Sequence, residues 1–209
     1  MPKMSDAHLE ARRQQILDAA EACFSSQGFH QTSMQAICSE AGLSPGAVYR
    51  YFSSKEDIIA ACCQACQQGH WDFIESLMAG GNSAIGMLDQ LVDEGFGILA
   101  DPGARDNLLM IIQLWAEAQR SPRIRDAYRD SYQKTWQDAF TNILVRGQES
   151  GEIDPELDAE SMARILNSAW CGLLLQKSLD PEIDVLSYVS TLKSVYRRAF
   201  STVVTTSRD

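Results

Sequence analysis

The sequence predicts an all-α fold of about nine helices arranged in two domains. Apolar residues recur at steps of three and four along almost the whole chain, whereas no stretch alternates apolar and polar residues as a half-buried strand does. Glycine and proline separate the periodic stretches, which is typical of helix ends. Residues 1–55 carry five basic and five acidic side chains, so the net charge of −10 lies entirely beyond residue 55. We therefore expect domains of residues 1–55 and 56–209.

Three helices are predicted in residues 1–55. The first ends at Gly28, which can adopt the left-handed conformation of a C-terminal cap. The second begins at a capping box at residues 32–35, with the Thr32 hydroxyl as N-cap, and stops at Gly42. The third begins at Ser44, a good N-cap, with proline at its first position. The expected apolar anchors are Ile16, Ala20, Cys23, Phe24, Met34, Ile37, Cys38, Val48 and Phe52.

The second domain is expected to contain six helices. Overlapping hydroxyl-to-acid pairs that start at Ser53 and Ser54 cap the first of them, which runs to Met78 with a weak point at Gly69. Glycine, proline and hydroxyl caps then delimit five more helical stretches, at residues 83–100, 104–119, 121–151, 158–179 and 182–203.

Composition narrows the class of protein. Of the 209 residues 45% are apolar and 22% charged, a mix typical of globular proteins. The longest apolar run, residues 169–175, is far shorter than the roughly 20 residues of a membrane-spanning helix. Residues 1–15 are polar and lack the apolar core of a secretory signal. We expect a cytoplasmic protein whose six cysteines are reduced thiols and for which no cofactor is implied.

Residues 32–55 combine two short helices with a tight turn at residues 41–44, the pattern of a helix-turn-helix. Gly42 supplies the positive φ that reverses the chain. If Val48 packs on Ile37 and Cys38, small residues and tyrosines of the second helix face outward. Small residues can approach base edges, tyrosine hydroxyls reach phosphates, and the helix N-terminus is partially positive. An ordinary helical corner explains the same spacing equally well.

The stretch from Arg12 to Ile59 resembles the TetR family of transcriptional regulators. The motifs that carry the resemblance are Gly-Phe at residues 28–29 with Thr32, Ala-Gly-Leu-Ser at 41–44, and Val-Tyr-Arg-Tyr-Phe at 48–52 with Ser-Lys-Glu at 54–56. The remaining residues match in outline, and their helix layout looks like the C-terminal domains of the BetI-like branch. The resemblance implies a helix-turn-helix DNA-binding domain in residues 1–55 and a ligand-binding and dimerisation domain in residues 56–209.

The resemblance also implies roles for individual residues. Thr32 and Ser33 hold phosphate at a helix N-terminus, and a short segment enters the major groove, formed by Ser44, Pro45, Gly46 and Ala47. Tyr49, Tyr51 and Lys55 grip the DNA backbone, and Arg50 reaches a guanine or a phosphate. Arg12 and Arg13 either add phosphate contacts or form a solvated helix start.

The implied function is a ligand-responsive transcriptional regulator, a repressor that binds a palindromic operator as a homodimer and is released by a small-molecule inducer, and not an enzyme. Aromatic residues with a few polar partners can line a cavity for a hydrophobic inducer; these are Phe96, Gln113, Trp115, Tyr132, Trp136, Asn167, Trp170 and Cys171. A cationic ligand also suits aromatic rings in acidic surroundings. The last two helices offer apolar faces for a dimer bundle, with Leu166, Trp170, Leu173, Leu174, Leu192, Val195, Tyr196 and Ala199.

Two alternatives stay open. Cys62, Cys66 and His70 recur at steps of four on one helix face, a spacing that suits a thiol- or metal-responsive regulator, although small cysteines also pack joints between domains. The second alternative is an all-α enzyme with its active site in the C-terminal cavity. The scarcity of histidine and the lack of a second metal-ligand cluster in the sequence argue against it.

Overall fold

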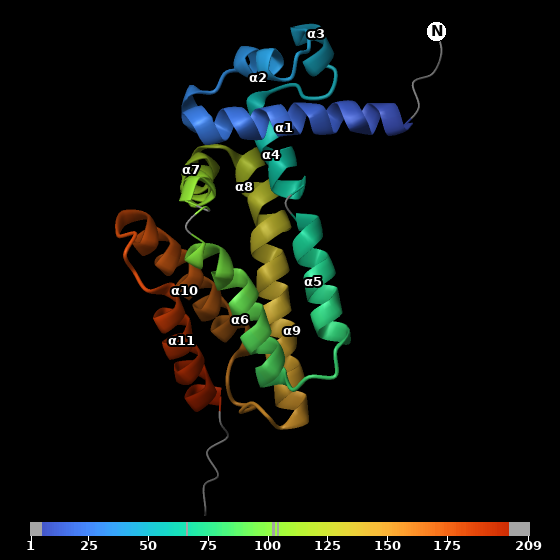
Figure 1. Cartoon of the computed structure of the whole chain (residues 1–209). Coiled ribbons are helices and arrows are strands. Elements are labelled where there is room, and N and C mark those ends of the chain that lie inside the picture. Colours follow the sequence, from blue (N-terminus) through green and yellow to red (C-terminus); the bar gives the residue numbers. More distant parts are fainter. Residues whose placement is uncertain (1–5, 66, 102, 104, 201–209) are drawn as a thin grey trace, which may run out of the picture. The chain divides into compact units, whose positions relative to one another are not determined.

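The computed structural model describes residues 6–65, 67–101, 103 and 105–200 (Figure 1). In these ranges the chain consists of helices and their connections, with no strand, which confirms the predicted all-α class. In chain order the helices are α1 (Asp6–Gln31), α2 (Met34–Glu40), α3 (Pro45–Val48), α4 (Lys55–Ala65), α5 (Gln67–Ala79), α6 (Ala84–Ala100), α7 (Arg105–Arg120), α8 (Pro122–Tyr128), the π-helix η2 (Arg129–Gln133), α9 (Lys134–Ser150), α10 (Ala159–Leu179) and α11 (Val185–Phe200). None of them combines the length and apolar character needed to cross a membrane.

The chain forms two compact units, each built from two separate segments. Unit 1 comprises residues 1–68 and 106–132, and unit 2 comprises residues 69–105 and 133–209. The boundary between compact units therefore does not fall after residue 55, where the charge pattern suggested it. The reason is burial: Ile58 and Ile59 of α4 are 0% and 2% exposed and lie in the same hydrophobic cluster as Ile16 of α1 and Ile124 of α8.

Unit 1 is built around α1 and α4. Helix α1 packs against α2 and α4, and α4 packs against α8. Arg123 of α8 forms an ion pair with Asp57 near the start of α4. The hydrogen bond from the Ser53 hydroxyl, together with Arg123, lowers the pKa of the Asp57 carboxyl. The Asp57 backbone N–H in turn donates to Ser54 Oγ at 3.2 Å, so the predicted hydroxyl-to-acid cap of α4 is confirmed.

The helix ends follow the predicted glycines. Gly28, Gly42 and Gly151 have φ values of 77°, 63° and 78°, in the left-handed region that favours glycine. At Gly28 the backbone leaves the helical conformation, and helical structure then continues to Gln31. Only a residue without a Cβ tolerates this break cheaply, so the glycine marks the end of the first long helical segment as predicted.

The hydroxyl caps of α2 and α3 need one correction. Ser44 caps α3 as predicted, because its Oγ accepts a hydrogen bond from the Ala47 N–H at 3.3 Å. Helix α2 is capped by Ser33 rather than Thr32, and Ser33 Oγ accepts from the Ala36 N–H at 3.1 Å. The predicted capping box was therefore one residue out of register.

One predicted long helix is subdivided, and a second runs through a residue that is not described. The predicted helix at residues 53–78 contains α4 and α5, and Cys66 between them lies outside the described residues. The stretch at residues 121–151 contains the π-helix η2 between α8 and α9. Apolar residues in this stretch recur at steps of four, wider than the 3.6 residues of an α-helical turn. The wider π-helical turn falls within this run.

In unit 2, α9 packs against α10 and α6, and α6 packs against α11. The indole N–H of Trp170 in α10 donates to the carbonyl of Gly95 in α6 at 2.6 Å. A Cβ at Gly95 would lie 3.2 Å from the ring of Trp136, so this glycine leaves room for the Trp136 indole against α6. Large side chains buried in this core include Met87, Leu88, Leu91, Phe96, Ile143, Leu166, Leu173, Leu174 and Phe200.

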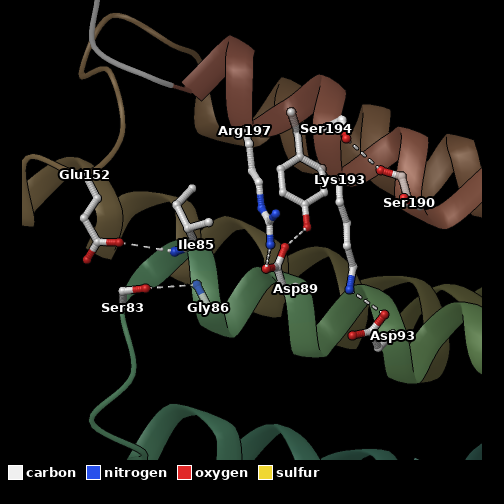
Figure 2. A network of polar contacts seen from close by, with 11 residues as sticks. Ser83, Ile85, Gly86, Asp89, Asp93, Glu152, Ser190, Lys193, Ser194 and Arg197 are labelled. Atoms are coloured by element: carbon white, nitrogen blue, oxygen red, sulfur yellow. Dashed lines mark hydrogen bonds and ion pairs between the residues drawn. The ribbon is translucent and has the colours of Figure 1, made fainter.

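A polar network joins α11 to α6 (Figure 2). The Tyr196 hydroxyl donates to Asp89 at 2.5 Å, and Arg197 pairs with the same carboxylate. About one turn along α6, Lys193 pairs with Asp93 at 2.5 Å. Burial, followed by the hydrogen bond to Asp89, raises the pKa of Tyr196, so the phenol stays protonated and remains a donor. Together these contacts fix the register of α11 on α6.

Candidate nucleic-acid interface

Helices α2 and α3 of unit 1 form a helix-turn-helix. The turn between them is closed by backbone hydrogen bonds from Gly42 N–H to Ser39 O at 3.1 Å and from Leu43 N–H to Cys38 O at 3.0 Å. Val48 of α3 is fully buried in the same cluster as Ile37 and Cys38 of α2. The predicted packing of the two helices is therefore confirmed.

The opposite side of α3 faces solvent. Ser44, Pro45, Gly46 and Arg50 are exposed, Tyr49 is 52% exposed, and Ala47 is half-buried. A Cβ built on Gly46 meets no heavy atom within 4 Å. The segment predicted to enter the major groove is therefore exposed to solvent, and the side chains at its start are small.

Thr32, predicted to hold a phosphate, is buried. Its side chain is 2% exposed, and the single hydrogen of its hydroxyl is shared between Gly28 O at 2.8 Å and Cys23 O at 3.2 Å. The hydroxyl therefore ties the α1–α2 connection to α1. Ser33, the next residue, is exposed and caps α2, so of the two predicted hydroxyls only Ser33 lies on the outer surface.

Lys55 has a structural task that the sequence did not reveal. Its ammonium donates to Phe29 O at 2.6 Å and to Thr32 O at 2.9 Å, which ties the start of α4 to the α1–α2 connection. An ammonium has three N–H donors, so one is left over for a phosphate. Tyr51 is half-buried and packs against the core cluster of unit 1, so its ring is also partly committed to the fold.

Two arginines of α1 lie near this region. The Arg13 guanidinium stands 5.8 Å from the centre of the Phe52 ring and pairs with Glu10 at 3.5 Å. Arg12 donates to Gln15 at 2.8 Å. The contact with Phe52, four residues after the end of α3, holds Arg13 close to the helix-turn-helix.

The predicted ligand-binding residues are divided between the two units. Gln113, Trp115 and Tyr132 belong to unit 1, and the others belong to unit 2. Gln113 is exposed, and its Oε1 accepts the Phe29 N–H at 3.1 Å within unit 1. Three of the unit 2 residues, with exposures of 2–5%, have packing roles in the core: Phe96, Trp136 and Trp170. Asn167 and Cys171 are half-buried neighbours on α10, and burial raises the pKa of the Cys171 thiol.

The thiol and metal alternative is not tested, because Cys66, one of its three residues, lies outside the described residues. Burial lowers the pKa of His70, whose ring lies edge-on to Trp136 at 5.3 Å. Among the residues for which the structure gives positions, no three His, Cys, Asp or Glu side chains are grouped to hold a metal ion.

The predicted dimer residues are mostly core residues of a single chain. Five of them are 0–5% exposed: Leu166, Trp170, Leu173, Leu174 and Tyr196. The outward faces of α10 and α11 instead carry exposed apolar residues that the sequence reasoning missed, namely Ile165 (57%), Leu175 (49%), Leu179 (80%) and Leu186 (73%). Val195 is 59% exposed, Ala199 is also exposed, and Leu192 is half-buried, so these three predicted residues remain on the surface.

A capped helix-turn-helix with an open second helix defines the class: a DNA-binding transcriptional regulator, not an enzyme. Two family descriptions match the sequence. "Bacterial regulatory proteins, tetR family" matches residues 16–62, and "BetI-type transcriptional repressor, C-terminal" matches residues 85–195, more than half of the chain. The chain belongs to the TetR family.

Relatives resemble the chain over nearly its whole length. The HTH-type transcriptional regulator UidR of Escherichia coli K12 is 27% identical over 197 residues, which are 92% of this chain and 95% of UidR. Among solved structures, Salmonella enterica GusR has a TM-score of 0.72 at 27% identity and covers 91% of this chain and 95% of its own. A regulator from Saccharomonospora viridis in complex with choline has a TM-score of 0.76 at 25% identity, with coverages of 92% and 99%.

We predict that replacing Lys55 weakens the fold as well as DNA binding. Lys55→Met removes two charge-assisted hydrogen bonds to carbonyls at the α1–α2 connection, and we expect the free energy of unfolding to fall by about 1–3 kcal/mol in urea denaturation. Arg50→Met is the matched control. Because Arg50 is exposed, its replacement should leave the free energy of unfolding within about 0.5 kcal/mol while lowering DNA affinity. Equal stability of the two variants would contradict the structural role of Lys55.

Proposed function

We propose that the protein is a repressor that binds a palindromic operator as a homodimer and is released by a small, mainly hydrophobic inducer. The observation that carries the DNA-binding part is the open N-terminal segment of α3, which is capped by Ser44 and contains Gly46. A Cβ built on Gly46 meets no atom within 4 Å. The lack of a side chain at Gly46 permits a close approach to base edges that a bulky side chain would prevent.

In this proposal α3 enters the major groove. Ser44, Pro45, Gly46 and Ala47 face base edges, and Arg50 contacts a guanine or a phosphate. The N-terminus of α2, capped by Ser33, faces a phosphate with its unpaired helix-end N–H groups and the positive end of its dipole. Tyr49, Tyr51 and the third donor of Lys55 add backbone contacts.

The proposed dimer uses the outward faces of α10 and α11. The exposed apolar residues of α10 follow a helical stripe at steps of seven, three and four through Ile165, Gly172, Leu175 and Leu179. A Cβ at Gly172 meets nothing within 4 Å, so a partner helix can approach closely there. Leu192, Val195 and Ala199 supply one face of α11, whereas Leu186 lies half a turn around the helix from Val195. Two such pairs make a four-helix interface with the two-fold symmetry of a palindrome.

The proposed inducer class rests on the aromatic content of unit 2 and on two structural neighbours. Bacillus subtilis FadR, solved with stearoyl-CoA, is 22% identical with a TM-score of 0.75, and the Saccharomonospora viridis regulator was solved with choline. One of these ligands carries a long acyl chain and the other is a small cation. The aromatic and apolar side chains of unit 2 favour the hydrophobic class, and choline represents the second candidate.

Gly46→Ala tests the groove-facing role of α3. We expect the fold to persist, because no atom within 4 Å opposes the new Cβ and alanine favours the helix by up to about 1 kcal/mol. Affinity for a duplex selected by the wild-type protein from a random pool should fall about tenfold or more in fluorescence anisotropy, since the methyl group meets a base edge. Gly97→Ala, an exposed glycine of α6 with the same open surroundings, is the control and should leave DNA affinity unchanged. Undiminished affinity of Gly46→Ala would overturn the docking.

The dimer face is tested by charge insertion at exposed positions. Ile165→Asp with Leu175→Asp should give a folded monomer in light scattering, because two carboxylates would be buried against the partner at a cost of several kcal/mol. Affinity for the selected duplex should fall with the loss of the dimer. Leu109→Asp, at an exposed position of α7, serves as the control and should remain dimeric. A wild-type monomer, or a doubly substituted dimer, would rule out this interface.

The inducer class is tested with stearoyl-CoA and choline in a closed cycle. A ligand that acts as inducer should lower affinity for the selected duplex by about 5–150-fold, and the duplex must weaken binding of that ligand by the same factor. Tryptophan emission provides the ligand-binding signal. A ligand that binds tightly and leaves DNA affinity unchanged is not an inducer, and failure of both compounds to alter DNA affinity would reject both candidate classes.

A further inference from the structure

The connection between α1 and α2, residues 28–32, is held by side chains from two other helices of unit 1. Gln113 of α7 accepts the Phe29 N–H through Oε1 at 3.1 Å, and Lys55 of α4 donates to the Phe29 carbonyl at 2.6 Å. Both backbone groups of one residue are therefore fixed from outside. Thr32 closes the same connection from within by donating to Gly28 O at 2.8 Å.

Gly28 makes the contact with Gln113 possible. Its φ of 77° and ψ of 164° turn the following peptide out of the helical pattern, so the Phe29 N–H needs an acceptor from elsewhere. A Cβ at Gly28 would lie 2.6 Å from Gln113 Oε1, closer than atoms can approach. Any larger residue at Gly28 would therefore displace the Gln113 amide from this position, and it would also be strained at a φ of 77°.

This connection leads directly into the N-terminus of α2. Ser33, the N-cap of α2, follows Thr32 without an intervening residue. Phe29 is 5% exposed and packs on Phe24 with ring centres 4.6 Å apart, so the connection is anchored at its apolar end and cannot shift freely. Gln113 and Lys55 then fix the orientation of the two peptide groups that flank the Cα of Phe29, through its N–H and its carbonyl.

We propose that Gln113 is a positioning residue for DNA binding: from α7 its Oε1 holds the Phe29 N–H, four residues before the Ser33 cap of α2, and so fixes how the helix-turn-helix joins α1. The inference rests on the proposed DNA docking of α2. In this proposal Gln113 acts in DNA binding, whereas the sequence suggested it as a ligand-binding residue.

The test compares variants that keep or remove the acceptor oxygen. Gln113→Met, of similar length and without the amide oxygen, should lower affinity for the wild-type-selected duplex by about three- to tenfold, the range expected for one lost hydrogen bond. Gln113→Glu retains the acceptor and should restore affinity to within about twofold of wild type. Gln119→Met, at an exposed glutamine of the same helix, is the matched control and should bind as wild type.

A double-mutant cycle adds a second measurement. Gly28→Ala should reduce duplex affinity more in the wild type than in Gln113→Ala, because the clash at 2.6 Å disappears with the long side chain and only the φ strain remains. Equal affinity of Gln113→Met and wild type, or failure of Gln113→Glu to rescue, would overturn the positioning role. If the wild type selects no duplex at all, the proposed function fails instead, so the two failures are distinguishable.

Discussion

The size of the helix-turn-helix is the constraint on which the rest of the structure depends. Three helices within 55 residues enclose little apolar surface to offset the conformational entropy lost on folding, so a domain of this size is marginally stable. Unit 1 meets this limit by adding α4, α7 and α8. Ile58, Ile59, Ala118 and Ile124 complete the cluster that also buries Val48 of α3. Helix α3 is only four residues long, and it is held against α2 and this cluster through Val48.

The sequence predicted the local features of the fold well. Left-handed glycines at residues 28 and 42 and the Ser44 cap depend on one residue and its neighbours, so a pattern suffices to find them. The choice between Thr32 and Ser33 as the cap of α2 could not be made locally, because adjacent hydroxyls satisfy the same motif. Burial of Thr32 against α1 decided it, and burial is a property of the folded unit.

The contacts that the sequence analysis missed join distant residues. Lys55 and Gln113 each bond to Phe29 across 26 and 84 positions of the chain, a separation at which no spacing rule applies. On α10 apolar residues occur on both faces, so the sequence did not tell the inward face with Leu166 and Leu173 from the outward face with Ile165 and Leu179. Aromatic residues such as Trp170 were ambiguous for a similar reason, because large rings serve both cores and cavities.

The discontinuous make-up of unit 1 has a consequence for biosynthesis. Its two segments are separated by residues 69–105, which belong to unit 2. On the ribosome, α1 to α4 therefore emerge long before Ala118 and Ile124, the residues that close their core. In the nascent chain, the side chains of Ile58 and Ile59 lack their contacts with α8 until α8 has left the exit tunnel. The helix-turn-helix precedes α8 in the sequence, yet the core of unit 1 is complete only once residue 124 has been made.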